Sequence, residues 1–336
     1  MTKASDIILA ARRAQNGDSK PPDRVIMACR NAILVHPSEH TRRAYIHDLD
    51  FFVRSISYGS NQGEAHVLLN LPRMFRREHA IAYRDLLRSS LSSRGRPLSD
   101  GTVNRRLAVM SAIFREFMRE GLVATNPFKG LTAGYRCDPT PALSNEERQR
   151  LLDAPDFEAA KTRSERQRRL RDKCLLALLF VHGIRQQEAR LVRTTDLGTN
   201  QGYYTITVKQ KRNLTIVHRL HPKLHHYIEL YRGEFMDGDG YVFTGLARNG
   251  NSAPGRPLSP QAIGYIVERW AEVAGIKQRV TPHVGRATVI TQALKKAPLQ
   301  VVARSIGHAS IESTARYDRN RNRMDQAIMT YQDCEL

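Results

Sequence analysis

The side chains suited to phosphate chemistry lie in the second half of the chain and comprise two arginines, two histidines, a lysine and a tyrosine. In chain order they are Arg185, Lys209 or Lys211, His283, Arg286, His308 and Tyr317. A guanidinium keeps its charge and offers a fork of donors to phosphate oxygens. Histidine and lysine can transfer protons, and a phenol can act as a nucleophile. The set therefore predicts attack on one phosphodiester, with protonation of the oxygen that leaves.

The predicted reaction is a transesterification in which Tyr317 attacks phosphorus. Arg185 and Arg286 would hold the non-bridging oxygens, which gather negative charge in the transition state, and His308 would add a third donor. His283 is the candidate general base or acid beside the phenol, and a lysine is the candidate to protonate the departing 5′ oxygen. The sequence shows no carboxylate cluster for Mg²⁺, so we expect neither a metal ion nor a cofactor.

The order of these motifs resembles the tyrosine recombinase or phage-integrase family, in its simple two-domain Xer- or Cre-like form. His283 and Arg286 form an H-x-x-R pair on one helix face, a Gly307-His308 pair follows, and Tyr317 comes nine residues after His308. The resemblance implies a site-specific DNA recombinase whose tyrosine becomes linked to a 3′ phosphate. A freed 5′ hydroxyl of a partner strand later displaces it, so no ATP is needed.

The same resemblance assigns further residues and shows departures from the family pattern. Lys209 matches the family's hairpin lysine best, with Lys211 as the fallback. Glu188, three residues after the first arginine, matches an acidic residue of the family that supports the catalytic groups without being one of them. Gly285 and Ala287 stand where the family usually has leucine and often has histidine. We therefore expect altered packing beside an intact catalytic set.

We expect a mainly α-helical protein with a small β-sheet. Residues 1–36 are interpreted as an N-terminal extension, 37–130 as a helical domain, 131–142 as a Gly- and Pro-containing linker, 143–320 as a mixed α/β domain, and 321–336 as a C-terminal segment. The resemblance identifies the helical domain as the core-binding, SAM-like DNA-binding domain and the α/β domain as the tyrosine recombinase catalytic domain. It also implies that the C-terminal segment is a helix that docks on a neighbouring protomer.

Local signals predict the elements that position the chemistry. Two strand-like stretches, 203–208 and 214–220, predict a β-hairpin that carries the lysines. Pro282 predicts a helix start just before the H-x-x-R pair. Ser144 begins a capping box, and Ser310 predicts a cap for the helix that presents the tyrosine.

The charge of the chain points to a polyanionic partner. Its 336 residues carry 53 Lys+Arg against 33 Asp+Glu, for a net charge of +20, and such a field favours nucleic acid. Residues 161–173 hold seven of these cations and two acids, and we expect them to contact DNA backbone. The alternative partner is an anionic membrane surface. The sequence lacks an apolar run of the roughly 20 residues that a spanning helix needs, so we expect a cytoplasmic, nucleoid-associated protein without a membrane partner.

The cysteines and a cluster of histidines predict no metal or disulfide chemistry. The cysteines are far apart, without a C-x-x-C motif: Cys29, Cys137, Cys174 and Cys334. Cys174 lies in an apolar helical pattern and is expected in the core. The histidine cluster lacks cysteine or acidic ligands at matching spacing, so we expect no metal there: His218, His221, His225 and His226.

The resemblance also implies an assembly. A homotetramer would act on two double-stranded DNA recombination sites and exchange strands through a Holliday junction, with a partner recombinase or accessory proteins left open. The catalytic set serves integration, excision, cointegrate resolution and dimer resolution alike. A type IB topoisomerase is one alternative, and the family-like helical domain argues against it. A non-catalytic DNA-binding protein is another, but it would have little reason to keep all six groups.

Overall fold

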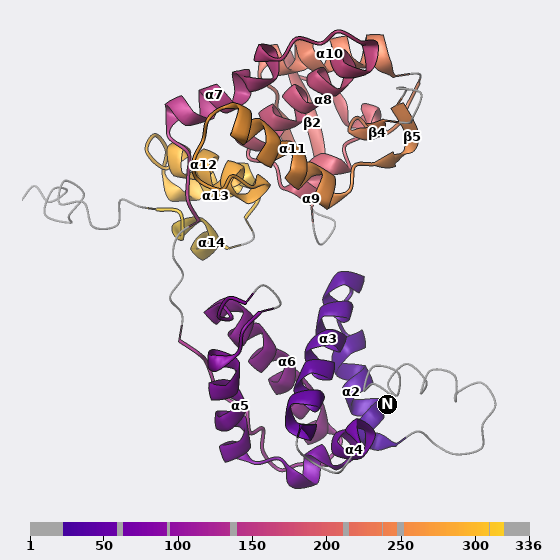
Figure 1. The fold of residues 1–336 in the computed structure, drawn as a ribbon, viewed down its shortest axis with the longest axis vertical. Coiled ribbons are helices and arrows are strands. Elements are labelled where there is room, and N and C mark those ends of the chain that lie inside the picture. Colours follow the sequence, from indigo (N-terminus) through magenta and orange to yellow (C-terminus); the bar gives the residue numbers. More distant parts are fainter. Residues whose placement is uncertain are drawn as a thin grey trace, which may run out of the picture. The chain divides into compact units, whose positions relative to one another are not determined.

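The computed structural model describes residues 23–58, 63–92, 95–134, 140–210, 215–236, 238–246, 252–308 and 310–318. These residues form two compact units, one up to residue 134 and one from residue 140 onward (Figure 1). Helices dominate both units and the sheets are small, which confirms the predicted fold class. The predicted docking helix at 321–336 and the fallback Lys211 lie outside the described residues, as do Cys137 and Cys334.

The first unit is helical around an aromatic core. Its described helices are α2 (Arg24–Leu34), α3 (Glu39–Ser57), α4 (Glu64–Met74), α5 (Arg77–Ser89) and α6 (Asp100–Arg119). The rings of Phe75 and Phe128 stack with centroids 5.4 Å apart, and Phe52 meets Phe75 edge to face. Phe114 packs against both Phe75 and Phe128. Offset and edge-on contacts of this kind add to the energy of burying the rings.

Helix α2 belongs to this core, although the sequence analysis places it in an extension. Val25, Ala28, Cys29, Ala32 and Ile33 are all buried among the residues of the first unit. The Asp23 side chain caps the helix by accepting a hydrogen bond from the backbone N–H of Val25. An apolar face so completely covered stabilises the unit, so the described part of 1–36 is an integral helix.

The second unit combines helices with two small sheets. Its described helices are α7 (Asn145–Phe157), α8 (Arg163–Phe180), α9 (Gln186–Arg190), the 3₁₀ turn η2 (Thr194–Asp196), α10 (Pro222–Phe235), α11 (Pro260–Val273), α12 (Pro282–Ala293), α13 (Leu299–Ile306) and α14 (Ile311–Ala315). The strands are β1 (Leu197–Asn200), β2 (Tyr203–Lys209), β3 (Thr215–Arg219), β4 (Thr244–Leu246) and β5 (Ser252–Pro257). Cys174 is fully buried on α8, as predicted.

The predicted hairpin is the pair β2–β3, which β1 extends to an antiparallel sheet in the order β1-β2-β3. Ile206 and Val208 of β2 are buried against the core of the unit. The sequence analysis does not include β1, because its residues Leu-Gly-Thr-Asn lack the alternation that marks a half-buried strand. The capping box at Ser144 and the helix start at Pro282 are both confirmed.

Much of the basic stretch 161–173 bonds within its own unit. Arg163 donates to the backbone oxygen of Glu234 at 2.8 Å, and Lys173 pairs with Asp156. These contacts tie α8 to α10 and α7. The expected DNA contacts of this stretch are therefore limited by internal bonds.

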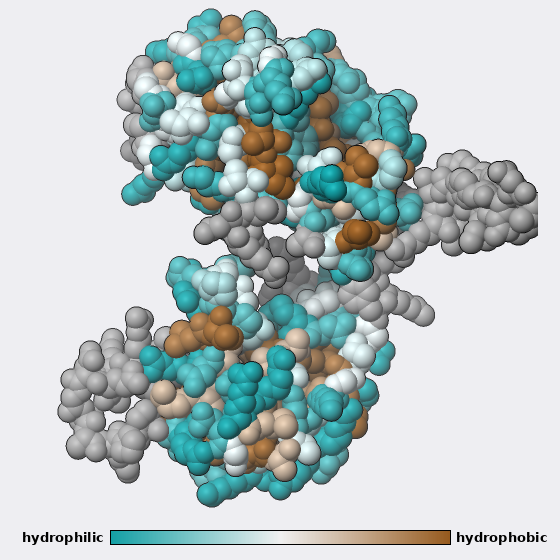
Figure 2. Space-filling view, turned by 180° about the vertical axis from the view of Figure 1, so that it is seen from behind, coloured by the Kyte–Doolittle hydropathy of each residue, from teal (hydrophilic) through white to brown (hydrophobic). Residues whose placement is uncertain are grey.

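Figure 2 shows a surface that is largely hydrophilic on the face in view. Within the described residues no helix is long and apolar enough to cross a membrane.

A buried polar network lies at the centre of the second unit. Asp172 accepts two hydrogen bonds from the Arg171 guanidinium, at 2.9 and 2.7 Å, and one from the Trp270 indole at 3.0 Å. Arg171 also donates to the backbone oxygen of Thr244 at 3.0 Å. The Arg171 guanidinium and the Trp270 indole thus share one carboxylate acceptor. Buried charges are tolerated only when they are paired and hydrogen-bonded.

Replacing Asp172 with alanine should destabilise the second unit by about 3–5 kcal/mol, because Arg171 and Trp270 would lose their shared acceptor. Trp270 is the single tryptophan of the chain, so urea unfolding followed by its fluorescence reports on this unit. The control is Glu268→Ala, which breaks an exposed pair with Arg279 and should cost less than about 1 kcal/mol. Equal losses in the two variants would contradict the prediction.

Candidate active site

Arg286 is held on backbone carbonyls from two other segments. It is 4% exposed on α12 and donates to the oxygen of Gly183 at 2.7 Å and to that of Ile306 at 2.8 Å. Gly285 makes this depth possible, because a Cβ there would lie 2.9 Å from the oxygen of Leu179 on α8. Gly285, one of the two departures from the family pattern, thus allows α12 to pack close against α8.

Arg185 lies at the start of α9 and is bound by Glu188. The Glu188 carboxylate accepts from the Arg185 backbone N–H at 3.0 Å and from its guanidinium at 2.7 Å. The same guanidinium donates to the oxygen of Gly307 at 3.2 Å. Glu188 is itself buried, and it offsets one of the two neighbouring positive charges, a geometry that suits the supporting role predicted for it.

Gly307 ends α13 in the left-handed conformation, with φ +69°. A Cβ at this position would clash with Ile216 and lie 2.5 Å from the Gln210 side chain. A side chain is therefore disfavoured by the backbone conformation, and the ends of the Ile216 and Gln210 side chains would have to move to admit it. The oxygens of Ile306 and Gly307, which hold the two arginines, are fixed directly under β2–β3.

The two histidines flank the tyrosine. The Tyr317 hydroxyl lies 3.4 Å from Nε2 of His283, and the Tyr317 ring centroid is 6.4 Å from that of His283 and 6.3 Å from that of His308. Nδ1 of His308 is 2.7 Å from the Thr314 hydroxyl. Ser310 occupies the cap position of α14 as predicted, but its side chain makes no capping hydrogen bond.

Burial and the arginine charges set the protonation of the site. Burial, then the charges of Arg286 and Arg185, lower the pKa of His308 to about 4. The same causes lower the pKa of His283. Burial and Arg185 lower the pKa of Arg286 to about 10. At pH 7 Arg286 is thus charged and both histidines are neutral, so the site is positive enough to bind an anion and His283 can accept a proton from the phenol.

Among the described residues, no hydrogen bond or ion pair joins Lys209 to the other five groups. It is exposed at the end of β2, and side chains alternate along a strand, so it points away from the side that buries Val208. The next residue, Gln210, does reach the oxygen of Ile306, at 3.5 Å. The hairpin end therefore lies at the site, and the identity of the lysine stays a prediction.

Sequence reasoning missed two features near the site. Thr314 is fully buried against His308, and nothing in its sequence context separates it from an ordinary helix threonine. His182 accepts a hydrogen bond from the His221 backbone N–H at 3.5 Å, and burial lowers the pKa of His182 to about 4.

In the part of the chain that the structure describes, no group of three or more His, Cys, Asp or Glu is placed to hold a metal ion.

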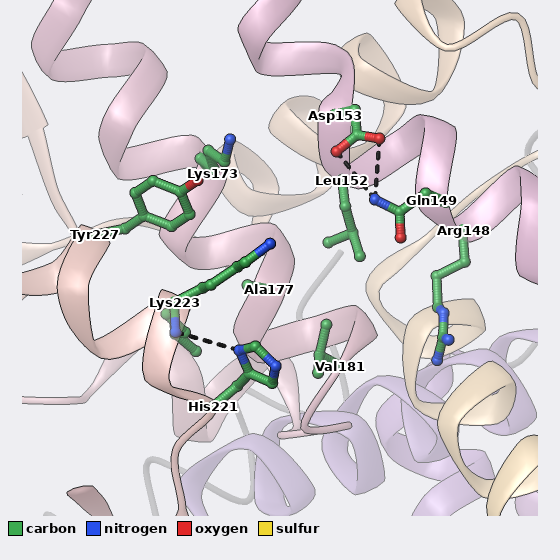
Figure 3. A pocket seen from close by; sticks show the side chains of 11 residues that line it. Arg148, Gln149, Leu152, Asp153, Lys173, Ala177, Val181, His221, Lys223 and Tyr227 are labelled. Atoms are coloured by element: carbon green, nitrogen blue, oxygen red, sulfur yellow. Dashed lines mark hydrogen bonds between the residues drawn. The ribbon is translucent and has the colours of Figure 1, made fainter.

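A separate pocket of about 360 Å³ opens between α7, α8 and α10 (Figure 3). Arg148, Lys173 and Lys223 line it together with His221 and Tyr227. None of the six candidate catalytic residues borders it. The pocket is therefore distinct from the place where the candidate catalytic residues meet.

Comparison with known proteins identifies the family. The model of the phage integrase family matches residues 142–324, which is more than half of the chain, and the chain belongs to this family. A tyrosine recombinase of Synechococcus elongatus is 29% identical over 306 residues, covering 85% of this chain and 86% of the relative. The tyrosine recombinase XerD of Ralstonia nicotianae is 28% identical over 220 residues, covering 64% and 68%. The protein is an enzyme of site-specific DNA recombination.

Solved structures share the fold. The XerH recombinase bound to palindromic difH substrate in a post-cleavage complex has a TM-score of 0.66 at 16% identity, over 98% of this chain and 97% of that one. A lambda integrase dimer bound to a COC′ core site has a TM-score of 0.60 at 16% identity, over 87% and 93%. At such low identity the likeness shows the tyrosine recombinase fold alone.

Replacing Gly307 with alanine should destabilise the protein by more than the backbone strain alone, because the ends of the Ile216 and Gln210 side chains must move to admit the added Cβ. Gly202→Ala is the control, since Gly202 also has a positive φ but open space around it. Its cost should be only the backbone strain of about 1–2 kcal/mol. Urea unfolding followed by Trp270 fluorescence measures the free energy of unfolding of both variants. A Gly307→Ala variant no less stable than Gly202→Ala would contradict the packing argument.

Proposed function

We propose that the enzyme cuts and rejoins DNA through a covalent bond between Tyr317 and a 3′ phosphate. The observation that carries the proposal is the Tyr317 hydroxyl 3.4 Å from Nε2 of His283, in a site whose two arginines are anchored by protein groups. Such a site needs a single anion to complete it. The scissile phosphate of a recombination site supplies that anion.

In this mechanism the arginines bind the phosphate with the donors they have left. Each guanidinium uses two hydrogen bonds to hold itself in place and keeps further N–H groups for non-bridging oxygens. Because these donors are fixed before the substrate arrives, they stabilise the charge that grows in the transition state without reorganising. His308 adds a donor to the same oxygens.

Proton transfer accompanies the attack. His283, whose pKa is lowered by burial and by the arginines, takes the phenol proton as Tyr317 bonds to phosphorus. The P–O bond to the 5′ oxygen breaks, and Lys209, or Lys211 in its place, gives that oxygen a proton. The phosphotyrosine conserves the bond energy, so the 5′ hydroxyl of a second strand can reverse the step on a new partner.

The wider reaction follows from the same chemistry applied twice. Four protomers would hold two double-stranded DNA sites and exchange one pair of strands, then the other, through a Holliday junction. The segment 321–336, outside the described residues, would dock between protomers. The task would be integration or excision of a mobile element, or resolution of cointegrates or replicon dimers, with a partner recombinase or accessory proteins left open. A type IB topoisomerase, which relaxes DNA as a monomer, is disfavoured because the Synechococcus relative covers 85% of this chain, more than the catalytic unit alone.

Changing Tyr317 to phenylalanine should abolish the covalent adduct while DNA binding remains, because only the attacking oxygen is removed. A nicked suicide duplex with a candidate site from the DNA flanking the gene traps the adduct on a denaturing gel. Tyr265→Phe is the matched control, because Tyr265 is exposed on α11 and should leave the adduct yield unchanged. Strand exchange by Tyr317→Phe at the normal rate would end the proposal.

The lysine that protonates the 5′ oxygen can be found with a bridging phosphorothiolate. In such DNA the departing atom is sulfur, which leaves without a proton. Lys209→Ala should slow cleavage of ordinary DNA by about 10²–10⁴-fold, the range typical of general acid catalysis, and should cleave the phosphorothiolate at the wild-type rate. The same behaviour of Lys211→Ala instead would transfer the role to Lys211. Neither variant behaving so would exclude both lysines.

A further inference from the structure

Thr314 joins the nucleophile's helix to His308. It lies on α14, three residues before Tyr317, and is fully buried. Its hydroxyl oxygen is 2.7 Å from Nδ1 of His308, a distance typical of a strong hydrogen bond. Neither atom is among the buried polar atoms that lack a partner.

The direction of this hydrogen bond follows from the burial of the threonine. Among the described residues, His308 is the one hydrogen-bond partner of the Thr314 hydroxyl. If the hydroxyl accepted a proton from Nδ1, its own proton would be buried with no acceptor, which is unfavourable. If it donates to Nδ1, that proton is used. The second arrangement is therefore favoured.

A donating Thr314 determines where the imidazole proton resides. In a neutral histidine one ring nitrogen carries the proton and the other accepts. When Nδ1 accepts from Thr314, Nε2 must carry the proton. Nε2 lies on the side of the ring away from Nδ1, so its N–H is directed away from Thr314. Among the described residues, that N–H has no hydrogen-bond acceptor and can donate to a substrate oxygen.

We propose that Thr314 is a positioning residue that fixes the tautomer of His308, so that Nε2 offers a proton donor to the scissile phosphate. The phosphate-binding part of this inference rests on the proposed function. The tautomer itself is a property of the free protein.

The charges around His308 agree with this arrangement. The positive groups that face it are Arg286, Arg185 and, when protonated, His283, and together with burial they lower its pKa to about 4. A neutral ring cannot offer N–H groups on both nitrogens, as an imidazolium would. Its single proton must be on the nitrogen that serves the substrate, and this makes control of the tautomer matter for the reaction.

The test compares two variants at this position with a matched control. Thr314→Val keeps the shape and removes the hydroxyl, whereas Thr314→Ser keeps the hydroxyl. The control is Thr244→Val, because Thr244 is also buried and its hydroxyl has no hydrogen-bond partner among the described residues. Urea unfolding of each variant shows that it is folded under the conditions of the assays.

The first readout is the tautomer of His308 in the DNA-free protein. Two-bond ¹H–¹⁵N correlations of histidine-labelled protein at pH 7 distinguish protonated from bare ring nitrogens, and His308→Gln assigns the signals. We expect the proton on Nε2 in the wild type, in Thr314→Ser and in Thr244→Val, and a shift toward Nδ1 in Thr314→Val. A proton on Nδ1 in the wild type, or an unchanged tautomer in Thr314→Val, overturns the proposal.

The second readout is the rate of adduct formation on suicide DNA in a single turnover. Thr314→Val should be slowed roughly 10- to 100-fold, less than the 10²–10³ typical of deleting an oxyanion donor outright, with DNA affinity unchanged. Thr314→Ser should restore most of the rate. A Thr314→Val rate equal to that of Thr244→Val overturns the proposal. Absence of an adduct in the wild type would instead refute the proposed function, and the tautomer measurement would still decide the role of Thr314.

Discussion

The site depends on how two guanidiniums are kept side by side before any anion arrives. Like charges repel, and the repulsion grows as water is excluded. Arg286 is stabilised by the oxygens of Gly183 and Ile306, and Arg185 by Glu188 and the oxygen of Gly307. Two of these oxygens belong to the C-terminal end of α13, where unpaired carbonyls give a helix its negative pole. The Glu188 carboxylate and three backbone carbonyls together thus compensate for the two charges.

That charge then governs the other groups. Together with burial, the arginines lower the pKa values of His283 and His308. Both imidazoles therefore stay neutral at pH 7 beside the two cations. Had the histidines been charged, the site would hold four positive groups and no base beside Tyr317. In the proposed mechanism, the remaining positive charge binds one phosphate, and the same charge keeps His283 neutral and able to accept the phenol proton.

Residue type and order pointed to these groups because a single arginine, histidine or tyrosine carries little information, whereas all of them in the family's order and spacing suit one chemistry. The structure brings five of the six predicted groups together. The role of Lys209 stays a prediction, because side-chain alternation along β2 decides which side of the strand it occupies and the residue pattern alone does not place it at the site. Thr314 gave no signal, since its importance lies in a distance to His308. Helix α2 was assigned to an extension because polar and Pro-rich residues precede it, and β1 was missed because pairing with β2, not its own sequence, makes it a strand.

The lack of a side chain at Gly307 lets the β2–β3 hairpin pack close to the segment that binds the arginines. Closely packed protein interiors move as contacting bodies and do not deform freely. Ile216 and Gln210 occupy the space that a Cβ would take. The end of the β2–β3 hairpin therefore packs directly against the peptide groups of Ile306 and Gly307, whose oxygens accept hydrogen bonds from both arginines. The hairpin and the two guanidiniums therefore contact the same short segment, Ile306 and Gly307, from which both arginines receive a hydrogen-bond acceptor.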